Sequence, residues 1–379
     1  MKSITRTELH THLMGMLSGE AFFNFLAEFD NEFRVPVDYN FLINFDDNTP
    51  FTATINDICL FNKAGNMRKI SIPHGETMPY SSLNDIYFTR GALLAKLIDF
   101  LSKKNNENAN DIKAMVYTKY LEACLKELIL QGVEYVEISF SNNKLIPEMV
   151  QRLDKSLLDN IQYRFLLSTD RKKQYKDFNQ SSRYLEKLIQ DGYCVGFDMM
   201  GSENAITDIE KDDKSNMSIF RKLTPIIEKL HKKDNTTLRI HSGETYVSEY
   251  NTAMILKILK QIKQTLKIEI PPPEIRIGHA IHFINNKNYI DLLKEFKCAI
   301  EINASSNYAL SNVATYKEIP YEYYLDNGID VVLSTDGHGV YDTSIKKENV
   351  IANYVIGDDK MDKVIDYDNK VLNDKKGVR

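Results

Sequence analysis

The chain of 379 residues has a formal net charge of -5, with 43% hydrophobic and 27% charged residues. These values are ordinary for a globular protein, so they exclude a largely disordered chain and argue against an extensive nucleic-acid surface. Four widely spaced cysteines without a CxxC pair disfavour a disulfide framework and a cysteine metal site. Because we find no apolar signal-peptide core and no run long enough to span a membrane, we expect a cytoplasmic protein without membrane contact.

Short stretches rich in β-branched residues recur along the chain and predict strands. They cover residues 4–12, 132–141, 163–170, 193–201, 237–244, 274–281, 297–307 and 329–337. Amphipathic segments of helical length lie between most of them, including 113–131, 181–190, 217–231 and 252–266. Strands that alternate with helices predict βα units and a parallel sheet. Eight units predict the α/β class and a closed (β/α)8 TIM barrel, with an open doubly wound sheet as the alternative.

We expect residues 1–379 to form a single barrel domain. Two parts of the chain do not follow the alternating pattern. Roughly residues 35–85, between the first and second strands, are expected to be an insertion, whose role the sequence does not reveal. The segment 343–379 is highly charged and predicts a helix followed by a frayed tail.

Histidines stand at the ends of several predicted strands. His10 and His12 are two residues apart, so on a strand they share one face and both point into the barrel mouth. Two imidazoles make half of a tetrahedral site for a metal such as zinc. His241 offers a third nitrogen and Asp336 a carboxylate, also at strand ends. A catalytic metal of this kind keeps one position open for a water whose pKa falls on binding.

The motifs around these residues carry a resemblance to a known family. TELHTHLMG, HSGET, RIGHA and LSTDG occur in this order, and they resemble the motifs of the adenosine deaminase family within the metal-dependent amidohydrolase superfamily. The segments YCVGFDMMGSEN, EYVEISFS and EINASSN are similar to further segments of that family. The resemblance spans Glu8 to Asp336 apart from the expected insertion. It implies a hydrolase in which a zinc-bound water attacks C6 of an adenine nucleoside or nucleotide and yields the inosine counterpart.

The resemblance also implies roles for individual residues. One Zn²⁺ per chain would be held by His10, His12, His241 and Asp336, and other divalent transition metals remain open. Glu244 is expected to exchange a proton with N1 of the purine. In a dry pocket its pKa would be raised, which suits an acid near neutral pH.

Three further contacts follow from the same resemblance. His279 is expected to orient and deprotonate the attacking water and to stabilise the tetrahedral intermediate. Gly201 would bind substrate by offering its backbone N–H to the purine ring, which a residue without Cβ allows. His12 and Asp336 are expected to contact the substrate in addition to the metal.

Two positions depart from the family pattern. The nucleoside deaminases of the family have aspartates where this chain has Met14 and Gly337. Loss of a carboxylate near the 5′ position removes repulsion of a phosphate, so we expect AMP, dAMP or ATP to be at least as good a substrate as adenosine. Arg6, Arg171 and His338 are the residues considered for phosphate contact, and His338 also for the ring.

Alternative functions stay open at this point. The same metal site could hydrolyse another amide or amidine, or the barrel could bind nucleotides without catalysis. The chain could also be the deaminase subunit of a larger nucleotide-depleting assembly, for instance in defence against phage. The expected partner is a small purine nucleoside or nucleotide, and the sequence leaves open homo-oligomer formation, metal identity and the preference for ribose or deoxyribose.

Overall fold

The computed structural model describes residues 4–29, 40–45, 49–54, 77, 80–203, 214–215, 218–245, 250–268, 274–283 and 287–376. Eight parallel strands neighbour one another in chain order. They are β1 (Thr7–His12), β4 (Tyr135–Phe140), β5 (Gln162–Asp170), β6 (Cys194–Met200), β7 (Thr237–Ser242), β8 (Glu274–His279), β9 (Ala299–Ile302) and β10 (Asp330–Leu333). Just beyond β10, the Asp336 N–H donates to the His10 carbonyl at 2.9 Å, and the His12 N–H donates to the Asp336 carbonyl at 3.2 Å. These bonds join the last strand to the first, which confirms the predicted (β/α)8 barrel.

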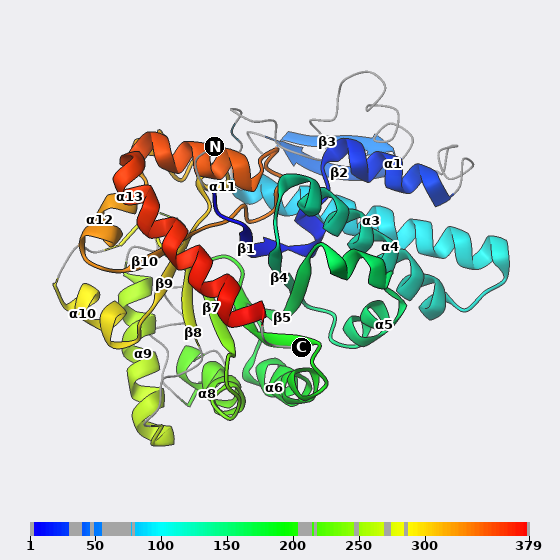
Figure 1. The fold of residues 1–379 in the computed structure, drawn as a ribbon. Coiled ribbons are helices and arrows are strands. Elements are labelled where there is room, and N and C mark those ends of the chain that lie inside the picture. The colour runs from blue at the N-terminus through cyan, green and yellow to red at the C-terminus, as the bar shows by residue number, and fades with distance from the viewer. Residues whose placement is uncertain are drawn as a thin grey trace.

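Helices surround the strands (Figure 1). They are α1 (Gly19–Phe29), α3 (Tyr80–Asn105), α4 (Ala109–Gln131), α5 (Leu145–Arg152), α6 (Tyr175–Gln190), α8 (Ile219–Leu230), α9 (Asn251–Leu266), α10 (Lys287–Glu295), α11 (Ala304–Ala309), α12 (Tyr321–Asp326) and α13 (Ile345–Lys376). Short 3-10 helices occur at η1 (Leu13–Gly15), η4 (Lys155–Asp159) and η6 (Tyr316–Glu318). Apolar strand residues such as Val136 and Ile240 share one buried cluster with helix residues such as Leu125 and Leu223. This cluster fixes the helices against the barrel wall.

The connection between β1 and β4 contains a β-hairpin in addition to helices. A separate antiparallel hairpin is formed by β2 (Asn40–Phe45) and β3 (Thr49–Thr54), and it lies beside α3 (Figure 1). Most of the remaining residues of the expected 35–85 insertion lie outside the described residues, so its predicted bounds stay a prediction.

The charged C-terminal segment forms the long helix α13, with a non-helical break at Gly357. Its second half crosses the amino ends of the strands (Figure 1). Asp368 accepts the backbone N–H groups of Arg6 and Thr7 at 2.9 and 3.0 Å, and Tyr367 donates to Glu274 at 2.7 Å. The helix therefore closes the end of the barrel opposite the predicted site.

The seventh strand is shorter than the predicted range 297–307. β9 ends at Ile302, and α11 begins at Ala304. The buried carboxylate of Glu348 accepts the N–H groups of Ala304 and Ser305 at 3.0 and 3.4 Å, which caps the new helix. This cap comes from a distant residue, so local sequence could not reveal it.

The described part of the chain offers no candidate for a membrane-crossing helix. None of its helices combines sufficient length with sufficient apolar character.

Candidate active site

A cavity of about 440 Å³ opens at the carboxyl ends of the barrel strands. Its lining includes six of the seven predicted site residues, namely His12, Gly201, His241, Glu244, His279 and Asp336. The seventh, His10, is fully buried beside them. The structure thus brings together residues from β1, β7 and β8 and from the turns after β6, β7 and β10.

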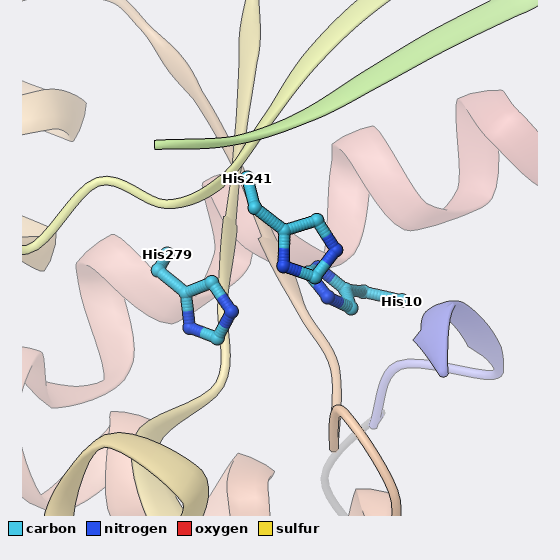
Figure 2. Close-up of side chains that lie close together, drawn as sticks. All are labelled: His10, His241 and His279. Carbon is cyan, nitrogen blue, oxygen red and sulfur yellow. The ribbon is translucent and has the colours of Figure 1, made fainter. Parts of the chain in front are cut away.

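Imidazoles and a carboxylate converge at one side of this cavity. The ring centroid of His10 lies 4.5 Å from that of His241 and 5.1 Å from that of His279 (Figure 2). Asp336 Oδ1 lies 3.5 Å from His10 Nε2 and 3.3 Å from His12 Nε2. Donor atoms of His10, His12 and Asp336 lie within 4.8 Å of one another, and so do those of His10, His241 and His279. We call His10, His12, His241, His279 and Asp336 the imidazole–carboxylate cluster.

The donor atoms of this cluster fit a divalent metal. Within the described residues, Nε2 of His10, His241 and His279 is buried and has no hydrogen-bond partner. A buried polar atom without a partner costs free energy, and such groups in native proteins usually serve a ligand. Imidazole nitrogens and carboxylate oxygens are among the donors that Zn²⁺ prefers.

A second layer of buried charges orients His10. Its Nδ1 lies 2.8 Å from Glu301 Oε2, and Glu301 is in turn 2.9 Å from Arg239 Nε and 3.2 Å from Arg276 Nη1. Burial alone would raise the pKa of Glu301, but the two guanidinium groups hold it at about 2. A carboxylate at Nδ1 directs the proton of the ring there and leaves Nε2 free to bind a metal.

Asp198 lies beside the Nε2 atom of His241, whereas Glu301 lies beside the Nδ1 atom of His10. Asp198 Oδ1 lies 3.3 Å from His241 Nε2, and Asp198 Oδ2 accepts the hydroxyl of Ser139. Burial would raise the pKa of Asp198, but His241 and Arg239 hold it below its ordinary value. Burial lowers the pKa of His241 to about 3, although the charge of Asp198 acts to raise it. The imidazole is therefore neutral, the form that binds metals.

Glu244 and His279 face one another across the cluster, with Oε1 and Nε2 3.8 Å apart. Burial raises the pKa of Glu244 to about 7, and Asp336 and Glu203 add to this while His279 opposes it. Burial would lower the pKa of His279, but the charges of Glu244 and Asp336 raise it instead. His279 Nδ1 is 3.0 Å from Asn307 Oδ1, which fixes the ring. The pair can hold and transfer protons near neutral pH.

Two residues of the site have a strained backbone. The φ angles of His279 and Asp336 are 70° and 64°, in the left-handed region that non-glycine residues rarely adopt. The following Ala280 N–H donates to the Ser242 carbonyl at 2.9 Å, and Asp336 is held by its bonds to β1. The surrounding hydrogen bonds therefore maintain a conformation that is typical of functional sites.

Sequence reasoning missed a residue that holds the turn carrying Glu244. The carboxylate of Glu203 accepts the N–H groups of Gly243 and Glu244 at 2.9 and 2.8 Å, and the Asn251 side chain donates to it at 3.1 Å. Arg171 donates from its guanidinium to the carbonyl oxygen of His241. Glu203 stands within the segment YCVGFDMMGSEN, but no spacing rule connects it with Glu244.

Gly201 has a φ of 99° and lies against Asp170. A Cβ at this position would be 2.6 Å from Asp170 Oδ1. Both residues line the cavity. The glycine is therefore required by its conformation and by the close approach of the carboxylate.

The residues considered for phosphate binding lie elsewhere. Arg6 pairs with Glu134 at 2.6 Å near the amino end of β1, and Arg171 is buried behind His241. His338 Nε2 lies 3.2 Å from Glu127 Oε2 rather than in the cavity. Among the described residues, the cavity lining contains no lysine or arginine.

Comparison with known proteins agrees with this geometry. The family model for adenosine deaminase matches residues 60–363. Adenosine deaminase of Enterococcus faecalis is 37% identical over 73 residues, and that of Clostridium kluyveri is 25% identical over 256 residues. These matches cover 19% and 64% of this chain, and the chain spans 22% and 63% of the two relatives.

A solved structure extends the comparison to the whole fold. The apo N6-methyl-AMP deaminase from Arabidopsis thaliana has a TM-score of 0.61 and 14% identity, covering 100% of this chain and 98% of that one. At this identity the likeness concerns the fold alone. The family match over most of the chain is decisive, and the chain belongs to the adenosine deaminase family.

Proposed function

We propose that the protein deaminates an adenine nucleoside or 5′-nucleotide by hydrolysis, releasing ammonia and the inosine counterpart. The observation that carries this proposal is the position of Glu244 and His279. Glu244 Oε1 lies 3.8 Å from Nε2 of His279, a member of the imidazole–carboxylate cluster, in a cavity large enough for a small ligand. Family membership supports the same reaction class.

His10, His12, His241 and Asp336 would hold the metal, and their nitrogen and oxygen donors favour Zn²⁺. A bound metal supplies a water whose pKa is lowered towards neutrality. Glu301 would keep the imidazole of His10 oriented for this purpose.

The proton transfers are assigned to the chain's own residues. Glu244, with a pKa of about 7, is partly protonated at neutral pH and donates its proton to N1 of the purine. His279 accepts a proton from the attacking water and, once positively charged, stabilises the negative charge that develops on the oxygen. Gly201 offers its backbone N–H to the ring from the wall formed by β6.

Two features bear on the substrate's 5′ group in opposite directions. At the positions of Met14, which lines the cavity, and Gly337, the nucleoside deaminases of the family have aspartates. The absence of these two carboxylates favours a phosphate. The described lining provides no lysine or arginine to pair with that phosphate. The Arabidopsis neighbour is named for a nucleotide substrate, so the proposal includes both substrate classes.

An ammonia-release assay on the zinc-loaded protein tests the proposal. The substrates are adenosine, 2′-deoxyadenosine, AMP, dAMP, ATP and adenine, with conversion to the hypoxanthine compound followed by absorbance. We expect turnover of at least one nucleoside or nucleotide and its loss in Glu244→Ala. Glu228→Ala, which changes an exposed glutamate of α8, is the matched control. Turnover of none of them, with metal bound, would show that the barrel acts on another amide or amidine or has no catalytic activity.

A further inference from the structure

We propose that the Asp170 carboxylate accepts a hydrogen bond from the 2′-hydroxyl of the substrate, so that the site selects ribose over deoxyribose. This inference rests on the proposed function, because it needs an adenine compound bound with C6 at the imidazole–carboxylate cluster. It assigns a specificity-determining role to a residue outside the metal and proton-transfer groups.

The placement of the cavity walls supports this role. The cluster and Glu244 come from β1, β7, β8 and the turns after β7 and β10, whereas Asp170 ends β5 and Gly201 follows β6. In an adenine nucleoside, C6 and the sugar-bearing N9 lie at opposite ends of the purine. A ring with C6 at the cluster therefore directs its sugar away from β8 and β10, towards the wall formed by β4, β5 and β6.

Asp170 gives this wall its charge. The cavity residues contributed by β4, β5, β6 and the turns after them include Ser141, Asn142, Ser168 and Gly201, and among those described Asp170 alone is ionisable. A carboxylate only accepts hydrogen bonds, so its natural partner is a donor such as a hydroxyl. A phosphate oxygen in this position would be repelled.

The carboxylate is held in place and stays accessible. Asp170 Oδ1 accepts the backbone N–H of Lys172 at 2.7 Å, which fixes the side chain in a local turn. Asp170 is partly exposed, and it lines the cavity. The carboxylate is therefore accessible to a ligand atom in the cavity.

The contact should be visible as discrimination between substrates. A hydrogen bond to a charged acceptor contributes enough that its loss lowers kcat/KM about 10- to 100-fold. We expect the zinc-loaded enzyme to prefer adenosine over 2′-deoxyadenosine by about this factor, and AMP over dAMP if nucleotides are turned over.

Asp170→Asn is the informative variant, because its amide oxygen can still accept the Lys172 N–H while a donor replaces the second oxygen. We expect kcat/KM to fall about 10- to 100-fold for adenosine but less than about threefold for 2′-deoxyadenosine. Asp177→Asn is the matched control, since Asp177 caps α6 outside the cavity lining.

The outcomes separate the two proposals. Turnover without a ribose preference in the unaltered enzyme would overturn the inference and leave the proposed function standing. Equal losses on both sugars in Asp170→Asn would show a structural role and would also overturn it. No turnover of any adenine compound would overturn the proposed function and the inference with it.

Discussion

Glu203 accepts the backbone N–H of Glu244 at 2.8 Å, and its other carboxylate oxygen accepts the N–H of the preceding Gly243 at 2.9 Å. One fully buried carboxylate thus holds both amides of the turn from which the proposed proton donor projects. The same negative charge helps to raise the pKa of Glu244.

Replacing Glu203 by Gln should affect both properties. Glutamine has one acceptor oxygen, so one backbone N–H loses its partner and Glu244 is held less firmly. Removal of the negative charge also lowers the pKa of Glu244, so the alkaline limb of the pH profile of kcat/KM moves to lower pH. We expect a fall in kcat of about 10- to 100-fold. An unchanged pH profile would show that the charge of Glu203 does not raise the pKa of Glu244. Glu228→Gln serves as the control.

The pH dependence of the unaltered enzyme should report Glu244 itself. Its pKa is raised to about 7 by burial, so the protonated form, which is the proposed donor to N1, prevails below pH 7 and is lost above it. We therefore expect kcat/KM to decline as the pH rises through about 7. Glu244→Gln cannot exchange this proton and should lose about 10²- to 10⁴-fold in kcat/KM. Activity close to that of the unaltered enzyme would contradict the assignment.

Removal of the metal should abolish activity and lower the melting temperature. A ligand that binds only the folded state stabilises it, by about 2.7 kcal/mol at a concentration 100 times its Kd. Elemental analysis and thermal melts before and after chelation, and after zinc is restored, measure both effects. His241→Ala should bind less metal and show a smaller melting shift, whereas His231→Ala, outside the cavity lining, should behave as the parent. Equal zinc content in the two variants would remove His241 from the ligand set.

Gly201→Ala should be destabilised and inactive. Its φ of 99° disfavours any side chain, and the added Cβ would lie 2.6 Å from Asp170 Oδ1. We expect a loss of about 1–3 kcal/mol in the free energy of unfolding, measured by urea denaturation. Gly91→Ala in α3 is the control, because a Cβ there meets no atom within 4 Å and alanine favours a helix. A stable, active Gly201→Ala protein would show that the close approach is not required.

Glu348, which is not part of the cavity lining, should make the stability of the protein depend on pH. Burial raises its pKa from 4.5 to about 7, so between these values the folded protein keeps a proton that the unfolded chain has released. Its contribution is complete below pH 4.5 and is lost as the pH rises through 7. The resulting change in the free energy of unfolding is at most about 3 kcal/mol. Unfolding free energies at several pH values should therefore fall less steeply for Glu348→Gln, and parallel curves would disprove the assignment.

The barrel and the convergence of the site residues could be predicted because both follow from local pattern. Strand periodicity marked all eight barrel strands, and the alternation of side chains placed His10 and His12 on one face. The same alternation also places charged residues on the face that carries the histidines, which the sequence analysis did not interpret. Glu8 precedes His10 by two residues and Arg239 precedes His241 by two, so charged residues inside apolar strands indicated a buried layer beneath the site.

Other features depend on contacts that no local pattern encodes. Glu203 reaches Glu244 across a gap of 41 residues, and Glu348 caps a helix 44 residues before it. The direction of an isolated side chain is equally hidden. For this reason His338, adjacent in sequence to Gly337, could not be distinguished from a cavity residue, although it faces Glu127. The roles assigned to the seven site residues stay predictions until the variants are measured.

Asp336 bonds to β1 through its backbone and reaches His10 and His12 through its carboxylate. The two ends of the barrel sheet must therefore meet before the proposed metal ligands are assembled. A nascent or truncated chain that lacks the last strand would have three histidines without their carboxylate partner. Partly folded forms of this protein should therefore lack the proposed deaminase activity.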